Sequence, residues 1–273
     1  MENIRLNNGV EMPLVGLGTW NLRGQDCSRV VAEALAMGYR LIDTAQMYGN
    51  EAEVGRGIAK SGVARDQIFL TTKIYRPSNS YAKAKAAIDA SLKSLGTDYV
   101  DLLLLHEPYK QGPEMYRALE EALAAGKARA IGISNYDARW YADFLTHCEI
   151  IPAVNQLECH VFFQKWAFQE ELLRHGTVLQ AWAPLASGEG GVPSNTVLRA
   201  IGERYGKTAA QVALRFLVQR GISVIPKSKH HARLKENLAL FDFTLSEDEM
   251  AAIRVLDRNA TFFPWTEAFG TPS

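Results

Sequence analysis

The chain has 273 residues, of which 47% are hydrophobic and 22% are charged, a composition typical of a globular protein. Its 30 lysines and arginines balance 30 aspartates and glutamates, so it lacks the basic field that a general nucleic-acid or anionic-membrane binder needs. The three cysteines show no C-x-x-C spacing, and neither a signal peptide nor an apolar run of ~20 residues is present. We expect a cytoplasmic protein with reduced thiols, one domain over residues 1–273, and no nucleic-acid or membrane partner.

The first elements along the chain are predicted to be strands. Residues 2–13 predict a hairpin, because Asn8 and Gly9 form a favourable type I′ turn sequence. Eight short β-rich runs follow, most of them starting about 30 residues apart, which is the length of one βαβ unit. The runs span residues 14–17, 41–43, 68–73, 99–105, 128–134, 153–157, 178–182 and 223–226.

Amphipathic helices are predicted between these strands. Residues 80–95 and 114–125 carry apolar side chains at helical spacing, and a glycine stop signal follows each run. Similar patterns begin at Asp137 and cover residues 208–219, and the long last interval also holds a loop and an extra helix at 197–205.

These units predict an α/β fold: a (β/α)8 TIM barrel with an N-terminal β-hairpin and extra helices near the C-terminus. The near-continuous apolar strands fit parallel strands that helices cover on both faces. The alternative is an open doubly wound sheet. It is disfavoured because residues 16–21 lack the third glycine of a G-x-G-x-x-G motif.

Four complementary side chains follow three consecutive strands, at the barrel end where active sites lie. Asp43 and Tyr48 follow the second strand, Lys73 ends the third, and His106 follows the fourth. A lysine lowers the pKa of a nearby phenol, and an aspartate holds that lysine charged. A histidine can orient a carbonyl oxygen while the tyrosine protonates it. The four residue types therefore predict a proton-donating site.

Each of these residues alone has an ordinary structural explanation. Asp43 is typical of a turn or helix cap, Tyr48 of a packed aromatic, and Lys73 of a solvated strand end. A lone histidine such as His106 is commonly structural. Their occurrence together on consecutive strand ends favours the functional interpretation.

At these residues the sequence resembles the aldo-keto reductase superfamily, in particular bacterial members related to 2,5-diketogluconate reductase. The segments that carry the resemblance are GLGTW (16–20), LIDTAQMYGNEAEVG (41–55), TTK (71–73), DLLLLHEP (101–108), AIGISNY (130–136), NQLE (155–158), AWAPL (181–185) and IPKSKHHARLKENL (225–238). The resemblance implies a barrel that binds NADPH or NADP+ without a Rossmann domain, with Asp43, Tyr48, Lys73 and His106 as the catalytic tetrad.

The implied activity is that of an NADP-dependent oxidoreductase acting on CH–OH and carbonyl groups. It reduces aldehydes and ketones to alcohols with hydride from nicotinamide and a proton from Tyr48. Short loops after the third and seventh strands suggest a broad carbonyl range. We expect a monomer that takes a small-molecule carbonyl substrate.

The resemblance also implies cofactor contacts. Ser134, Asn135 and Gln156 match positions that bond the nicotinamide carboxamide. Trp182 matches the stacking aromatic, which is tyrosine in many members. Leu185 matches a pyrophosphate-loop position, and the adenosine end is matched by Lys227, Ser228, Arg233, Glu236 and Asn237. The basic residues of this block independently fit a 2′-phosphate, the alternative being a solvated basic run. His230 and His231 have no further ligand at metal spacing, so we expect both to be exposed and no metal site.

The substrate pocket is expected to be lined by Trp20, Tyr48, His106 and Tyr75. Glu107 departs from the tryptophan or glutamine of many relatives, and it faces either the pocket or the helix layer. Residues 262–265 form either an apolar lid or rim packing. Two other functions remain open: a regulatory protein that binds NADPH, and a barrel enzyme that uses Lys73 as a Schiff-base nucleophile.

Overall fold

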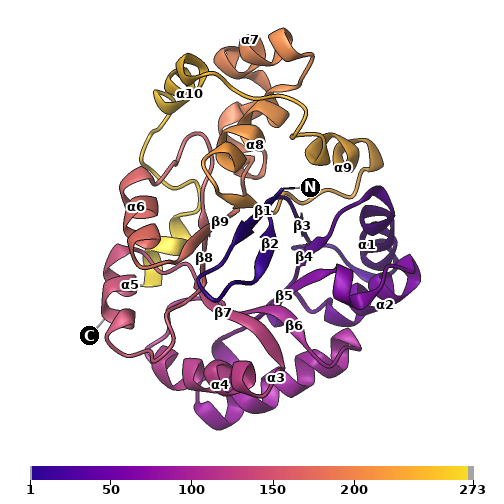
Figure 1. Cartoon of the computed structure of the whole chain (residues 1–273), viewed down its shortest axis with the longest axis vertical. Helices are drawn as coiled ribbons and strands as arrows, with labels where there is room; N and C mark the ends of the chain where they lie inside the picture. The colour runs from indigo at the N-terminus through magenta and orange to yellow at the C-terminus, as the bar shows by residue number, and fades with distance from the viewer. Residues whose placement is uncertain (1, 270–273) are drawn as a thin grey trace.

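Eight strands of the described chain form one parallel sheet in chain order that closes on itself (Figure 1). The structure is a computed structural model and describes residues 2–269. The strands are β3 (Leu17–Gly18), β4 (Leu41–Asp43), β5 (Phe69–Ile74), β6 (Val100–Leu105), β7 (Ala128–Ser134), β8 (Val154–Glu158), β9 (Val178–Trp182) and β10 (Ser223–Val224). The predicted (β/α)8 barrel is confirmed.

The first and last strands meet across a short seam. Val15 bridges Val224 in parallel, and the Gly16 amide donates to the Val224 carbonyl at 2.8 Å. A β-carbon on Gly18 would lie 2.6 Å from the Ile225 carbonyl oxygen, so only glycine allows this approach. The first strand therefore begins later than the predicted 14–17, because its opening residues form only this isolated bridge.

The N-terminal hairpin is present, but its turn differs from the prediction. Strands β1 (Asn3–Arg5) and β2 (Glu11–Pro13) pair antiparallel. The Gly9 amide donates to the Leu6 carbonyl at 2.9 Å, and the Leu6 amide donates to the Val10 carbonyl. Gly9 has φ of 86°, whereas Asn8 is not among the residues with positive φ. The turn is thus a three-residue loop with a glycine bulge, and the type I′ prediction was wrong.

Ten helices surround the barrel in the described part of the chain (Figure 1). Ser80, Asp137 and Thr208 cap three of them with side-chain hydrogen bonds, close to the predicted starts. The extra helix near the C-terminus is also present, as α7. The helices are α1 (Gly24–Met37), α2 (Glu51–Ser61), α3 (Tyr81–Leu95), α4 (Gly112–Ala124), α5 (Ala138–Leu145), α6 (Trp166–Arg174), α7 (Thr196–Tyr205), α8 (Ala209–Gln219), α9 (His231–Leu238) and α10 (Glu247–Arg254). None of the helices within residues 2–269 is long and apolar enough to cross a membrane.

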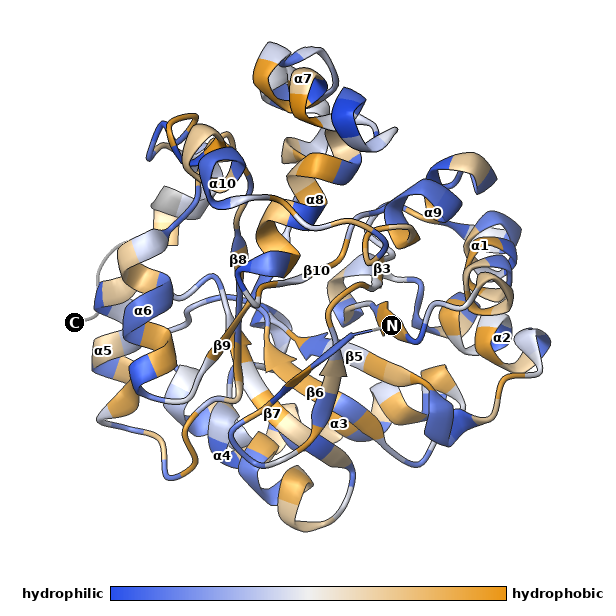
Figure 2. Ribbon diagram, turned by 45° about the horizontal axis from the view of Figure 1, so that its top comes forward, coloured by the Kyte–Doolittle hydropathy of each residue, from blue (hydrophilic) through white to orange (hydrophobic). Residues whose placement is uncertain are grey.

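Two apolar cores hold the barrel together. The larger core lies between the strands and the helices, and the hydrophobic colouring of the strands and inner helix faces follows it (Figure 2). The smaller core fills the barrel interior, where the hairpin contributes Leu6 and Met12 beside Leu41, Phe69, Leu102 and Leu104. The hairpin therefore plugs the N-terminal end of the barrel, and the opposite end is left for a site.

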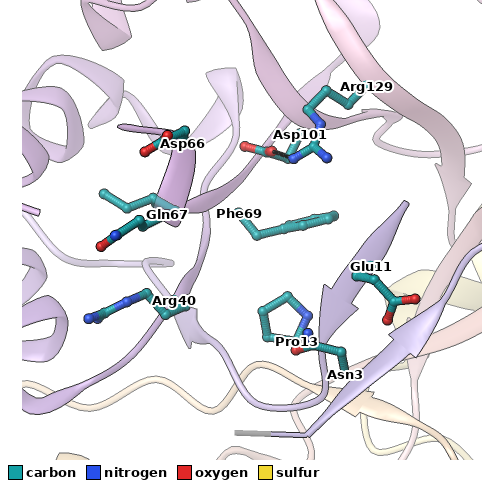
Figure 3. A pocket seen from close by; sticks show the side chains of 10 residues that line it. Asn3, Glu11, Pro13, Arg40, Asp66, Gln67, Phe69, Asp101 and Arg129 are labelled. Atoms are coloured by element: carbon teal, nitrogen blue, oxygen red, sulfur yellow. Dashed lines mark hydrogen bonds and ion pairs between the residues drawn. The ribbon is translucent and has the colours of Figure 1, made fainter. Parts of the chain in front are cut away.

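A cavity of about 360 Å³ lies at the plugged end, between the hairpin and the strand starts (Figure 3). The buried acid in its lining is paired, because the Asp101 carboxylate accepts from Arg65 at 2.8 Å and from Arg129 at 2.7 Å. These ion pairs join β6 to β7 and to the segment before β5. The residues singled out by the sequence lie at the other end of the strands.

Candidate active site

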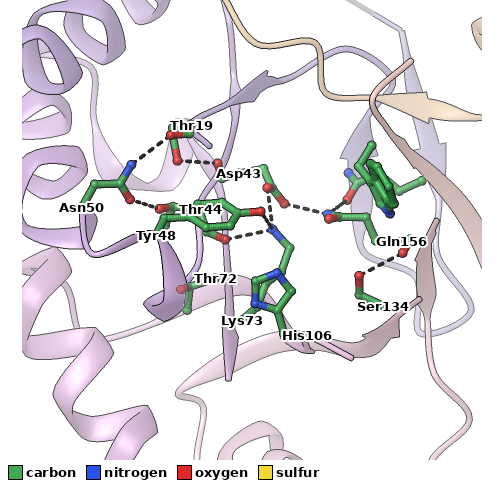
Figure 4. A network of polar contacts seen from close by, with 12 residues as sticks. Thr19, Asp43, Thr44, Tyr48, Asn50, Thr72, Lys73, His106, Ser134 and Gln156 are labelled. Carbon is green, nitrogen blue, oxygen red and sulfur yellow. Dashed lines mark hydrogen bonds and ion pairs between the residues drawn. The ribbon is translucent and has the colours of Figure 1, made fainter. Parts of the chain in front are cut away.

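A buried lysine joins the acid and the phenol at the carboxyl end of the barrel (Figure 4). Lys73 Nζ donates to Asp43 Oδ1 at 2.6 Å, to the Thr44 carbonyl at 3.1 Å and to Tyr48 Oη at 3.2 Å. Lys73 is 0% exposed and Asp43 is 1% exposed. β4 and β5 are neighbours in the sheet, so their ends bring Asp43 and Lys73 together, and the short 3-10 helix η1 (Gln46–Tyr48) returns Tyr48 over them.

Burial governs the titration of this group. Burial lowers the pKa of Lys73, but Asp43 and Tyr48 outweigh it and hold that pKa above its ordinary value. Burial also raises the pKa of Tyr48, although Lys73 opposes the shift. The expected lowering of the phenol pKa is thus outweighed in the free protein. Tyr48 is protonated and Lys73 is charged at neutral pH.

His106 stands beside this group as a neutral imidazole. Its ring centroid lies 5.6 Å from that of Tyr48, and its backbone amide donates to the Ile74 carbonyl at 2.9 Å. Burial, then Lys73, holds the pKa of His106 well below its ordinary value. Its buried Nδ1 has no hydrogen-bond partner within residues 2–269. A neutral imidazole carries one N–H, which makes His106 a hydrogen-bond donor rather than a charge.

The residues expected around the nicotinamide lie together at the ends of β7 and β9 and within β8. Ser134 Oγ donates to the Gln156 carbonyl at 2.9 Å. Asn135, which has φ of 63°, donates to the His106 carbonyl at 3.2 Å and accepts from Trp182 Nε1 at 2.8 Å. Gln156 Nε2 donates to Asp43 Oδ2 at 2.7 Å (Figure 4). The last bond links this cluster directly to the acid beside Lys73.

Comparison with known proteins agrees with this arrangement. The model of the Aldo/keto reductase family matches residues 14–258. The chain belongs to the aldo/keto reductase family. It is therefore an oxidoreductase of a family that acts on carbonyl groups and uses nicotinamide cofactors.

Individual relatives match along nearly the whole chain. Glyoxal reductase of Bacillus subtilis is 40% identical over 265 residues, with 96% of this chain and 95% of that protein covered. A 9,11-endoperoxide prostaglandin H2 reductase of Trypanosoma cruzi is 39% identical over 274 residues, with 97% of each covered. A solved structure provisionally identified as 2,5-diketo-D-gluconic acid reductase B is 43% identical, with a TM-score of 0.90 and coverage of 94% and 92%.

The positions of this aldo/keto reductase that were expected at the adenosine end lie in the segment after β10 and in α9. Lys227 and Arg233 are exposed, and no ion pair joins either to an acid within the described residues. Ser228 and Asn237 are buried, and Ser228 Oγ accepts from the His230 amide at 3.1 Å. His230 and His231 are exposed, as expected.

Two other expected cofactor residues have particular surroundings. Glu236 accepts a hydrogen bond from the Thr208 hydroxyl, so part of its carboxylate already has a protein partner. Leu185 is partly buried between Ala183 (φ 47°) and Ala186 (φ 55°). Positive φ in alanine is strained and is typical of backbone held for ligand contact.

The substrate side is partly aromatic. Trp20 is 51% exposed and packs edge-on against Tyr48, with ring centroids 4.9 Å apart. Tyr75 follows β5 and packs against the outer core. Glu107 accepts a hydrogen bond from the Tyr109 hydroxyl at 3.1 Å.

Two supporting residues were missed by sequence reasoning. Asn50 is fully buried; its side chain accepts from Thr44 Oγ1 at 2.8 Å and donates to the Thr19 carbonyl at 2.9 Å. It thereby fixes the turn that carries Tyr48. Gln180 Oε1 accepts from Gln156 Nε2 at 2.7 Å and so holds the Gln156 amide. Asn50 lies within the LIDTAQMYGN segment that carries the resemblance, so the sequence could have indicated it. Gln180 could not be recognised, because in the sequence it is a single polar residue in a core strand.

Proposed function

We propose that this protein reduces aldehydes and ketones to alcohols with NADPH as cofactor. The observation that carries the proposal is the contact of one buried ammonium, Lys73 Nζ, with both Asp43 (2.6 Å) and Tyr48 Oη (3.2 Å), beside neutral His106. The bound cofactor supplies hydride to the carbonyl carbon. We further infer that the chain is one domain over residues 1–273, acts as a cytoplasmic monomer and accepts a broad range of carbonyls.

Tyr48 acts as the general acid in this proposal. It stays protonated at neutral pH because burial raises its pKa, so the proton is available when negative charge develops on the substrate oxygen. The Lys73 ammonium, 3.2 Å from the phenol oxygen, stabilises the phenolate that remains. Asp43 keeps Lys73 charged. His106 donates a hydrogen bond that orients the carbonyl oxygen toward Tyr48.

The residues present fit a nicotinamide cofactor. The side-chain Nε2 of Gln156 donates both of its hydrogens, one to Asp43 and one to Gln180. Its side-chain oxygen, Oε1, is therefore left to accept a hydrogen bond from a carboxamide. Ser134 and Asn135 lie beside it, and Trp182 offers an aromatic face for stacking. Leu185 would approach the pyrophosphate.

The adenosine end fits NADPH better than NADH. Exposed Lys227 and Arg233 have no acidic partner in the described chain, and a 2′-phosphate would supply one. Ser228, Glu236 and Asn237 would complete this end of the site, beside the start of α9, where a phosphate is favoured.

The Schiff-base alternative is disfavoured by the state of Lys73. A lysine nucleophile must be neutral, whereas ion pairing with Asp43 holds the pKa of Lys73 above its ordinary value. The experiment that tests the proposed function is the loss of NADPH absorbance with a panel of aldehydes, ketones and keto-sugars. Turnover supports it. NADPH binding without turnover of any carbonyl favours the regulatory alternative.

The Arg233→Ala variant should lose preference for NADPH. A charge-assisted hydrogen bond to a phosphate contributes about 1.5–3 kcal/mol, so the KM for NADPH should rise roughly 10–100-fold. The KM for NADH and the kcat with either cofactor should change little. Steady-state kinetics with both cofactors checks this. An Arg199→Ala variant on α7 is the matched control for removing an exposed arginine, and equal losses for NADPH and NADH would contradict the assignment.

The pH profile of carbonyl reduction should be flat through neutrality. His106 is already neutral because burial lowers its pKa, so no change in its charge is expected between about pH 6 and 8. Tyr48 stays protonated below its raised pKa, so kcat should fall only above about pH 10, where the acid is lost. Measuring kcat at saturating cofactor tests both statements. A limb near pH 6.5 would contradict the neutral imidazole.

A further inference from the structure

Another buried acid, Glu158, lies beyond the proposed catalytic group. Glu158, at the end of β8, is 3% exposed, and His160 is 0% exposed. His160 Nε2 lies 3.0 Å from Glu158 Oε1, and the Phe162 amide donates to His160 Nδ1 at 3.3 Å. Both ring nitrogens of His160 therefore have a hydrogen-bond partner. The reduction steps proposed above use neither residue.

The remaining acceptor sites of Glu158 hold a segment that is distant in sequence. The Thr261 hydroxyl donates to Glu158 Oε2, and the Phe262 amide donates to Oε1 at 3.0 Å. Thr261 Oγ1 in turn accepts from the Phe263 amide at 2.8 Å. The His160 ring stacks on Phe262, with centroids 5.0 Å apart and planes at 22°. Glu158 and His160 therefore bind both the backbone and the side chain of residues 261–263.

The anchored segment places two aromatic rings on Trp182. Phe263 meets Trp182 edge-on with ring centroids 5.0 Å apart. Trp265, from the 3-10 helix η5 (Pro264–Phe269), stacks on Trp182 at 5.7 Å and 19°. Glu158 pairs in register with Trp182 across β8 and β9. The anchor thus lies one strand away from the ring that it helps to cover.

We propose that Glu158 and His160 are positioning residues that fix an aromatic wall, formed by Trp182, Phe263 and Trp265, beside the reacting groups. Trp182 also donates to Asn135, which donates to the His106 carbonyl, so the wall is continuous with the proposed site. The inference rests on the proposed function. In this inference Glu158 determines the shape of the substrate side of the site without touching substrate or cofactor.

The alternative is that the pair only stabilises the fold. A purely structural pair would change unfolding without changing the wall or the KM for substrate. The wall should have its own signal, because the indoles of Trp182 and Trp265 are stacked closely enough to give a coupled circular dichroism band. This band reports the position of residue 265 independently of turnover.

The test compares Glu158→Ala with the conservative Glu158→Gln, which keeps one carbonyl acceptor for the Phe262 amide. We expect Glu158→Ala to lose the coupled indole band and to raise the KM for the carbonyl substrate roughly tenfold, with a much smaller change in kcat. Glu158→Gln should restore most of both. Arg129→Gln, which removes one ion pair to a buried acid at the opposite barrel end, should change neither.

A second variant keeps the proposal testable if Glu158→Ala does not fold. Thr261→Val removes only the hydroxyl from the held segment and leaves Glu158 paired with His160. It should weaken the indole band and raise the KM in the same direction. A folded Glu158→Ala, or Thr261→Val, with wild-type band and KM would overturn the proposal. If the wild-type protein reduces no carbonyl, the proposed function is contradicted. The indole band still tests whether Glu158 and His160 hold residues 261–263.

Discussion

Replacing Tyr48 with phenylalanine is expected to lower kcat for carbonyl reduction by about 10²–10⁴-fold, the usual contribution of a positioned general acid. The phenyl ring keeps the edge contact with Trp20, and only the oxygen that Lys73 contacts is lost. The Kd for NADPH, measured by quenching of tryptophan fluorescence, should therefore remain within about threefold of the wild-type value, since the substitution removes none of the proposed cofactor contacts.

The matched control is Tyr205→Phe, which removes a phenol hydroxyl that donates to Glu249 far from the barrel mouth. This variant should keep wild-type kcat. A Tyr48→Phe variant with wild-type kcat would show that the proton comes from another group, and the proposed mechanism would fail.

Replacing Lys73 with methionine should damage both activity and stability. The variant leaves the Asp43 carboxylate buried with the Gln156 amide as its remaining side-chain donor. Removing one partner of a buried ion pair typically costs about 3–5 kcal/mol, so the free energy of unfolding should fall by that order. Turnover should fall as well, by about 10²-fold or more, because no ammonium stabilises the phenolate of Tyr48.

The double variant Lys73→Met/Asp43→Asn separates the two effects. It removes the uncompensated charge, so most of the lost unfolding free energy should return while kcat stays low. Denaturant unfolding and steady-state kinetics on the three proteins provide the check. Recovery of kcat in the double variant would contradict the role given to Lys73.

Much of the fold followed from the sequence because the strand and helix signals were local. The regular spacing of apolar runs and the capping residues Ser80, Asp137 and Thr208 predicted elements close to those observed. The predicted type of the hairpin turn was wrong because the Asn8-Gly9 sequence suits two turn types. The hydrogen bond between Leu6 and Val10 selects the longer loop. Loop length was not encoded in the dipeptide itself.

The candidate site was predictable where it depends on strand ends. The barrel brings Asp43, Lys73 and His106 together simply because β4, β5 and β6 are adjacent. The bond from Gln156 to Asp43 was not predictable, because the two residues lie on opposite sides of the barrel and 113 positions apart. The anchor from Glu158 to Thr261 spans 103 positions and was missed for the same reason.

The direction of the Tyr48 pKa shift also required the structure. The sequence supplied the lysine that lowers the pKa, but the opposing effect of burial depends on Trp20 and His106 packing around the ring. Local charge partners can be inferred from strand ends, whereas desolvation is a property of the assembled barrel.

The most direct test of the central claim is to follow the reducing hydrogen itself. NADPH that carries deuterium at both positions of nicotinamide C4 is incubated with the wild-type protein and glyoxal, and the alcohol product is examined by NMR. We predict deuterium on the carbon that carries the new hydroxyl, with no such product from Tyr48→Phe on the same timescale. NADPH bound by the wild-type protein with no deuterated alcohol from glyoxal or any carbonyl of the panel would contradict the account.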